Sequence, residues 1–281
     1  MKSISVYQIY YDEATKIQLQ PDFLPLDNTK NLRPDWAEYW VIRQFFENNE
    51  LNSKNWYGFF SPSFARKTEL TDSQVIQFVQ QQEADCEVIL FSPYWANTSF
   101  FKNPFEQAEW EHQLLPTAIK FFKSIGSSVD LENYIAHREN TVYCNYFVAK
   151  PRFWMRWLEI TNALFELAEN PDSSMYAELN EDAQYQFGQY GKKVFIIERI
   201  ATTILVHESF KTASYDTFAL PSHNAGFDLH REQLIKCEAL KRLYASTRED
   251  RHLMEFISAR NLIWNLTASF QNRSAKRYSR W

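Results

Sequence analysis

Glu198 and Arg199 place an acid and a base side by side within the otherwise apolar segment 194–207. Removing an unpaired charge from water is costly, so both groups must be paired or must face a polar cleft. A cleft would make the carboxylate and the guanidinium available to a ligand. The alternatives are a helix with both side chains on its solvated face, or a structural ion pair of Glu198 with Arg199 or Lys192.

A second segment of unusual composition lies upstream at 143–154, where the sequence is YCNYFVAKPRFW. It places Asn145, Lys150 and Arg152 among aromatic side chains. Asn145 either binds a ligand hydroxyl or satisfies a buried backbone group, and the sequence leaves both interpretations open.

The chain lacks the motifs of several common enzyme classes. With only 5 Gly it contains neither a G-x-G-x-x-G fingerprint nor a P-loop, and it has no G-x-S-x-G elbow. Its Cys and His residues show no zinc-ligand spacing; only His223 and His230 are close together, with Asp228 between them. We interpret that cluster as a polar loop rather than a metal site. Dinucleotide-dependent and P-loop enzymes are therefore not expected.

Aromatic residues are abundant, at 17% of the chain. Aromatic rings stack on the apolar faces of sugars, although most of these side chains must fill a core. The formal net charge of −5 gives no overall attraction to nucleic acid. Composition therefore leans weakly towards carbohydrate and predicts no nucleic-acid partner.

The sequence indicates a cytoplasmic protein. No segment approaches the roughly 18 consecutive apolar residues of a membrane span, the N-terminus lacks the apolar stretch of a secretory signal, and the 3 Cys are widely spaced, as suits a reducing compartment. The basic tail 273–281 allows at most a peripheral contact with the inner face of a membrane. We favour a frayed, solvated tail.

The pattern of apolar residues predicts an α/β domain. Strands are expected at 4–11, 56–60, 87–91 and 142–149, and helices at 35–49 with Asp35 as N-cap, from Thr71, at 104–125, 151–168 and 194–210. The alternation of strands and helices in the N-terminal part favours a largely parallel sheet. Ligands of such sheets bind beyond the carboxyl ends of the strands, which are here Asp12, Ser61 and Ser92.

The C-terminal part of the chain is expected to form a separate helical region. A soft joint is expected near 220–226, and the apolar pattern is helical from Arg231 onwards. Its predicted core positions include Leu234, Leu243, Met254 and Leu262. We therefore divide the chain into a first domain at 1–220 and a helical C-terminal subdomain at 221–281.

An ordered set of segments resembles bacterial glycosyltransferases of the GT-A-like kind, which build capsules, exopolysaccharides or lipopolysaccharide O-chains. The matching segments are an early strand, EYWVI at 38–42, YGFFSPSFARK at 57–67, EVILFSP at 87–93, NYFVAKPRFW at 145–154 and FIIER at 195–199. The resemblance covers about residues 4–207. It implies a Rossmann-type mixed sheet flanked by helices, in which 1–220 would be the catalytic domain that binds a nucleotide sugar.

The resemblance also implies roles for individual residues. Glu198 matches the late acidic motif and would deprotonate the acceptor hydroxyl as general base. Lys67, Arg66 and Arg199 would offset the charge that develops on the leaving diphosphate, unless they are solvated surface charges. The other expected donor-binding residues are Tyr10, Tyr11, Asp12, Ser61, Ser92 and Asn145.

Many GT-A enzymes hold a divalent metal with an Asp-x-Asp motif that follows a central strand. This chain has Ser92-Pro-Tyr-Trp95 at that position, and the nearest acids, Asp85 and Glu87, precede the strand. Either transfer proceeds without a metal, with Lys67 and Arg199 in its place, or the protein is not an active transferase. We favour metal independence and expect no cofactor, with a divalent metal as the alternative.

The sequence thus predicts a glycosyltransferase that moves a sugar from a nucleotide-sugar donor to a hydroxyl of a growing bacterial surface glycan or its lipid-linked form. Such a domain would suit one module of a larger protein. A non-catalytic carbohydrate-binding or assembly module is the alternative, which the missing Asp-x-Asp supports. The strand-rich first half disfavours a purely helical interaction protein.

Overall fold

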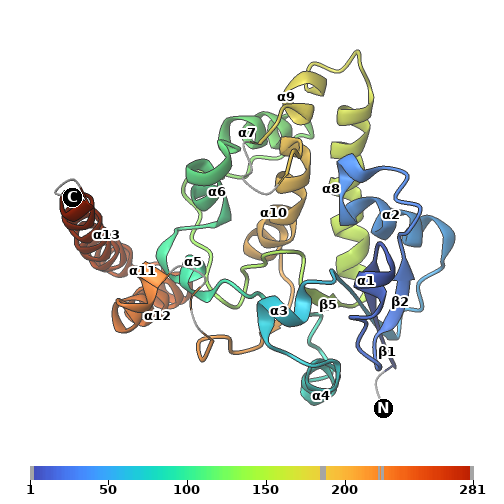
Figure 1. Ribbon diagram of the computed structural model, residues 1–281, viewed down its shortest axis with the longest axis horizontal. Coiled ribbons are helices and arrows are strands. Elements are labelled where there is room, and N and C mark those ends of the chain that lie inside the picture. Colours follow the sequence, from blue (N-terminus) through green and yellow to red (C-terminus); the bar gives the residue numbers. More distant parts are fainter. Residues whose placement is uncertain (1–2, 184–187, 221, 223–224, 279–281) are drawn as a thin grey trace.

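A computed structural model describes residues 3–183, 188–220, 222 and 225–278, and it shows a six-stranded mixed sheet flanked by helices (Figure 1). The strands are β1 (Ser3–Tyr10), β2 (Leu24–Asp27), β3 (Asn55–Phe60), β4 (Val88–Leu90), β5 (Phe147–Ala149) and β6 (Thr212–Ser214). The helices of the first half are α1 (Glu13–Lys16), η1 (Pro34–Trp36), α2 (Glu38–Asn48), α3 (Phe64–Thr68), α4 (Asp72–Gln81), α5 (Trp95–Phe100), α6 (Pro104–His112) and α7 (Leu115–Ser124). Those of the second half are α8 (Pro151–Glu169), α9 (Tyr176–Asn180), α10 (Lys192–His207), α11 (Ala225–Asp228), α12 (Arg231–Thr247) and α13 (Asp250–Tyr278).

The order of the strands creates a natural ligand-binding edge. The sheet order is β2-β1-β3-β5-β4-β6; β5 runs antiparallel to both neighbours, and the other pairings are parallel. The amino end of β5 therefore lies at the same edge as the carboxyl ends of β3 and β4. From β1 the chain passes to β2 on one side and later to β3 on the other, so the order reverses between β1 and β3. Such a switch point is where α/β sheets bind ligands.

Alternating side chains of β3 fill two apolar layers, one on each face of the sheet. Tyr57 and Phe59 pack with Trp154 of α8 in the layer that also includes α2 and α10. Trp56 and Phe60 point to the opposite layer, which α3 and α4 cover. This two-residue period is the one that a strand buried on both faces requires.

Helix α2 begins later than the sequence predicts, and Asp35 is not its N-cap. The backbone forms the short 3-10 helix η1 first, and α2 then starts at Glu38 without a side-chain cap. The Asp35 carboxylate is engaged elsewhere, because it accepts hydrogen bonds from Arg33 and from the buried Lys193 of α10. By contrast, α4 begins as predicted, with a capping box between Thr71 and Gln74.

The strand predicted at 142–149 is much shorter in the structure. Only Phe147–Ala149 pairs as β5, because Cys144 and Asn145 have left-handed backbone conformations that interrupt an extended strand. The short strands β2 and β6 were not predicted. Strand β2 contains Pro25 and lies at the edge of the sheet, where a residue without an amide proton is tolerated.

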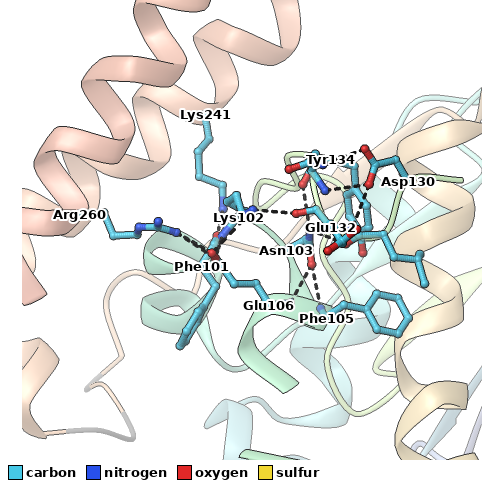
Figure 2. Close-up of polar contacts among 12 residues, drawn as sticks. Phe101, Lys102, Asn103, Phe105, Glu106, Asp130, Glu132, Tyr134, Lys241 and Arg260 are labelled. Carbon is cyan, nitrogen blue, oxygen red and sulfur yellow. Dashed lines mark hydrogen bonds and ion pairs between the residues drawn. The ribbon is translucent and has the colours of Figure 1, made fainter. Parts of the chain in front are cut away.

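Helices α12 and α13 form a hairpin that packs against α5 on the side of the molecule opposite to β2 (Figure 1). Figure 2 shows how polar groups join them to the α/β part: Lys241 reaches the carbonyl of Phe101, and Arg260 pairs with Glu106 of α6. Lys241 also donates to the carbonyl of Thr98, so it satisfies two carbonyl groups near the end of α5. The region is helical as predicted.

Some expectations for the C-terminal part are wrong or fall outside the description. Leu234 is buried, but Leu243, Met254 and Leu262 are 45%, 70% and 53% exposed, because they lie on the outer side of the hairpin. The tail residues 279–281 lie outside the described residues, as do parts of the predicted joint at 220–226. Within the described part of the chain, no helix is long and apolar enough to cross a membrane.

Candidate functional site

A pocket with a cavity volume of about 50 Å³ lies at the switch point between β1 and β3. Its walls come from six places in the chain: the ends of β1 and β3, the start of α2, the turn before β5, α3 and the first half of α10. The apolar part of its lining is Ile9, Trp36, Ala37, Tyr39, Ile42, Phe59, Val194 and Ile197. The polar part is Glu38, Ser61, Lys67, Cys144, Asn145 and Glu198. Four of these polar residues were predicted from sequence as site residues.

Ser61 and Lys67 enter the pocket from the carboxyl end of β3 and from the helix that follows it. The Ser61 hydroxyl and the buried Tyr146 hydroxyl share a 2.5 Å hydrogen bond. The Lys67 ammonium donates to the Cys144 sulfur at 3.2 Å and lies 5.9 Å and 5.8 Å from the ring centres of Tyr94 and Tyr146. The aromatic faces hold this cation without cancelling its charge.

The turn before β5 brings Cys144 and Asn145 to the pocket, where the Cys144 sulfur contacts Lys67. Their φ angles are 60° and 53°, a region that non-glycine residues rarely adopt. Burial raises the pKa of the Cys144 thiol to about 11, although Lys67 opposes this, so the thiol is neutral at pH 7. The side-chain oxygen of Asn145 is buried without a hydrogen-bond partner in the protein. A ligand or water in the pocket would supply the missing donor.

Glu38 was not predicted as a site residue, although it lines the pocket at the first position of α2. The residue before it, Ala37, has φ 47° and ψ −135°, a strained conformation for a residue with a Cβ atom. The hydroxyl of Tyr11, which follows β1, lies beside the Glu38 side chain, and burial together with this carboxylate raises the pKa of Tyr11. Tyr11 therefore stays protonated next to Glu38. Tyr11 was predicted, and it reaches the pocket through Glu38.

Glu198 lies on the face of α10 that closes the pocket. Protein surrounds its carboxylate on most sides, yet 35% of the side chain is exposed, and it lines the opening. Burial raises its pKa above the ordinary 4.5; Arg199 and Lys67 oppose this rise, and Glu38 adds to it. A carboxyl group with a raised pKa inside a pocket is typical of residues that transfer protons.

Arg199 does not reach the pocket, although it is adjacent to Glu198. One residue of an α-helix turns the side chain by about 100°, and this turn directs Arg199 into the protein. Its guanidinium is 4% exposed and donates to the carbonyls of Pro104 and Phe195 and to Gln107. Its closest approach to the Glu198 carboxylate is 3.8 Å. Arg199 therefore joins α10 to α6. Its guanidinium is not part of the pocket lining, where we expected it to contact a diphosphate.

Three other expected donor-binding residues lie away from this pocket. Asp27 of β2 lies beside the Tyr10 hydroxyl and raises its pKa, and Asp12 caps α1 by accepting from the backbone of Thr15. Ser92 follows β4 and lines a smaller hollow at the same edge of the sheet, together with Arg138. Arg66 is exposed on α3 and donates to Ser63.

The lining offers more hydrogen-bond acceptors than donors. Two carboxylates and the free oxygen of Asn145 face one cation, Lys67, among the described lining residues. No group of three or more His, Cys, Asp or Glu residues suited to a metal ion occurs in the part of the chain that the structure describes. His223, half of the histidine pair singled out from the sequence, lies outside that part. The acceptors of the pocket are thus suited to an uncharged ligand group rich in hydroxyls. Lys67 is suited to a neighbouring anionic group.

Sequence reasoning missed Glu38, Tyr94, Tyr146 and Cys144 as neighbours of the predicted residues. The available signal was their place in the quoted segments EYWVI, Ser92-Pro-Tyr-Trp95 and YCNYF, but nothing in the spacing shows which side chains face inwards. Comparison of the chain with protein families, with curated proteins and with solved structures finds no match.

Proposed function

We propose that this protein is a glycosyltransferase that moves a sugar from a nucleotide-sugar donor to a hydroxyl of a bacterial surface glycan or its lipid-linked form. The mixed sheet flanked by helices is compatible with the GT-A-like fold that the sequence resembles. A peripheral place at the inner face of the membrane would suit a lipid-linked acceptor.

One observation carries the proposal. Ser61, Lys67, Asn145 and Glu198 come from segments that are far apart in the chain, and all four line one pocket at the switch point of the sheet. The sequence singles out Ser61 by its place at a strand end, and Lys67, Asn145 and Glu198 by the resemblance to sugar transferases. A structural role for each of them would not require them to meet.

The pocket supplies the groups that sugar transfer needs. Glu198 accepts the proton of the acceptor hydroxyl as that oxygen attacks the anomeric carbon of the donor. Lys67 stabilises the negative charge that develops on the leaving diphosphate, the role that a metal has in many GT-A enzymes. The neutral thiol of Cys144 leaves the charge of Lys67 available for this purpose.

A non-catalytic carbohydrate-binding module is the second candidate. The segment after β4 reads Ser92-Pro-Tyr-Trp95 without a carboxylate, and Lys67 is the single cation among the described lining residues. A protein that only holds a glycan would need neither a base nor charge stabilisation. It would bind glycans without binding nucleotide sugars.

Replacing Glu198 with glutamine tests the catalytic proposal. Loss of a general base lowers turnover by about 10²- to 10⁴-fold, and the fold should persist, since the glutamine removes a carboxylate that burial disfavours. Glu208→Gln, at the end of the same helix and paired with Arg156, is the matched control and should keep its activity. Release of nucleoside diphosphate in the presence of acceptor glycan measures turnover, and thermal unfolding measures stability. Unchanged turnover in Glu198→Gln, or a large loss of stability, would assign Glu198 a structural role.

The pH profile gives an independent check. A base must be deprotonated, so activity should fall with decreasing pH through a pKa that lies above the ordinary 4.5 of glutamate, because burial raises it. The effect on stability has the opposite sign. The protonated form is favoured in the folded state, so the contribution of Glu198 to stability is present at low pH and is lost as the pH rises through the folded-state pKa.

A further inference from the structure

Glu38 occupies a place in the pocket that the proposed transfer reaction leaves unexplained. The reaction uses one carboxylate as a base, yet two carboxylates line the pocket, and Glu38 raises the pKa of Glu198. A second negative charge would repel a diphosphate in the same place. The group of the ligand that contacts Glu38 must therefore donate hydrogen bonds and carry no negative charge.

The backbone places this carboxylate at the pocket. Glu38 follows the strained residue Ala37 and begins α2, whose N-terminus has no side-chain cap. Glu38 lines the pocket, and the Tyr11 hydroxyl lies beside it at the end of β1. The carboxylate is thus available to a ligand, with a hydroxyl donor as its neighbour.

We propose that Glu38, with Tyr11 beside it, recognises a vicinal diol of the nucleotide-sugar donor, so that it is a specificity-determining residue. This inference rests on the proposed function. A carboxylate has two oxygens and about four lone-pair positions, so it can accept hydrogen bonds from two adjacent hydroxyl groups and still have a position for Tyr11. Acidic residues near the switch point of other α/β sheets bind ribose hydroxyls in this way.

The diol has two possible sources in a nucleotide sugar, the ribose and the transferred sugar. Both have neighbouring hydroxyl groups that can donate hydrogen bonds to a carboxylate. The pocket lies beyond β1 and β3 and is also lined by the buried, unpartnered oxygen of Asn145, which can accept a third hydroxyl. Removing one hydroxyl of the ligand at a time separates the two sources.

Calorimetric titration with deoxy ligands provides the test. The probes for the ribose are UDP, GDP and CDP with their 2′-deoxy forms, and the probes for the sugar are UDP-glucose and UDP-2-deoxyglucose. Because a hydrogen bond to a charged group is strong, we expect wild-type protein to prefer the intact ligand by about 10- to 100-fold in one of the two arms. Glu38→Gln should reduce this preference to a few-fold, and Tyr11→Phe should reduce it partly.

Glu47→Gln is the matched control, because Glu47 lies on the same helix with its side chain 48% exposed and paired with Arg43. It should retain the full preference. The inference is wrong if Glu38→Gln keeps the preference of the wild type, or if the wild type shows no preference in either arm. In both cases nucleotide binding would still support the proposed function. Tighter binding of UDP-glucosamine than of UDP-glucose that depends on Glu38 would assign it to an ammonium group and overturn the diol. If none of the nucleotides binds, the proposed function fails and the inference fails with it.

Discussion

Replacing Gly58 with alanine tests how closely β5 must approach β3 to build the pocket. Gly58 pairs with Val6 of β1 and with Val148 of β5, so it lies at the centre of the sheet. A Cβ atom at this position would lie 2.8 Å from Cγ2 of Val148 and 3.3 Å from the carbonyl oxygen of Phe147. The first distance is shorter than real Cβ contacts, and the second allows little movement because it involves backbone.

The expected cost follows from this geometry. Val148 is completely buried and β-branched, so it cannot turn its methyl group away into open space. Overpacking of this kind costs about 1–3 kcal/mol. For a chain of this size each kcal/mol lowers the melting temperature by about 2–4 °C. The strands would separate slightly, and the turn with Asn145 at the amino end of β5 would move relative to Ser61 at the end of β3.

Urea unfolding followed by tryptophan fluorescence measures the loss of stability, and a double-mutant cycle with Val148→Ala identifies its cause. Val148→Ala alone should cost about 2–3 kcal/mol, because it removes two buried methyl groups and leaves a cavity. In the Gly58→Ala background the same change removes the clash. The double variant should therefore lose at least about 1 kcal/mol less stability than the sum of the losses in the two single variants. Costs that add within about 0.5 kcal/mol, or an unchanged stability of Gly58→Ala, would refute the close-approach argument.

Two further changes test a charge in the pocket and a charge at the junction of α12 with α5. Lys67→Met should weaken binding of the nucleotide-sugar donor by about 10-fold or more while acceptor binding changes little. It should also move the acidic limb of the pH–activity profile to higher pH, because Lys67 lowers the pKa of Glu198. Equal effects on donor and acceptor binding would argue against a diphosphate role for Lys67. Lys241→Met should lower the free energy of unfolding by about 1–3 kcal/mol, because the carbonyls of Thr98 and Phe101 lose their donor. Burial lowers the pKa of Lys241 to about 8, so stability of the wild type should rise between pH 8 and 10.5, and this slope should be absent in the variant.

The sequence predicts the elements of this fold well where local periodicity determines them. The strand at 56–60 and the helix that starts from Thr71 depend on neighbours within one or two turns, and both were predicted correctly. The edge at which the site lies also follows from local information, because carboxyl ends of parallel strands meet at one edge. Ser61 was predicted on that ground and lines the pocket.

Partners that are distant in sequence account for the errors. Asp35 has the spacing of a helix cap to Glu38, but Lys193, on a helix more than a hundred residues away, takes its carboxylate. A buried ammonium needs a counter-charge more than a helix end needs one additional cap, since an unpaired buried charge costs more than the loss of a cap. No pattern within the first helix could reveal that competition.

Glu198 and Arg199 show how one residue of spacing separates two roles. The sequence places both in an apolar run, and pairing with each other was one of the interpretations. The helix directs the glutamate to the pocket and the arginine to backbone carbonyls of α6 and α10, where its charge is satisfied without a ligand. The sequence was sufficient to single out the pair, but the direction of each side chain depends on how α10 is rotated against the sheet.

Three residues with positive φ angles, Ala37, Cys144 and Asn145, line the pocket. Glu69, Gln113 and Arg248 adopt such angles at helix ends, where they are common, and Asn31 adopts one in the turn after β2. The positive φ angles of Ala37 and Cys144 cost roughly 1–3 kcal/mol each, whereas asparagine adopts this region more readily, and glycine at positions 37 and 144 would relieve part of the cost. The chain instead keeps side chains there and buries an unpartnered Asn145 oxygen beside them. A bound ligand that donates hydrogen bonds to this oxygen and to the two carboxylates would offset the free-energy cost of the strained backbone and of the unpartnered oxygen.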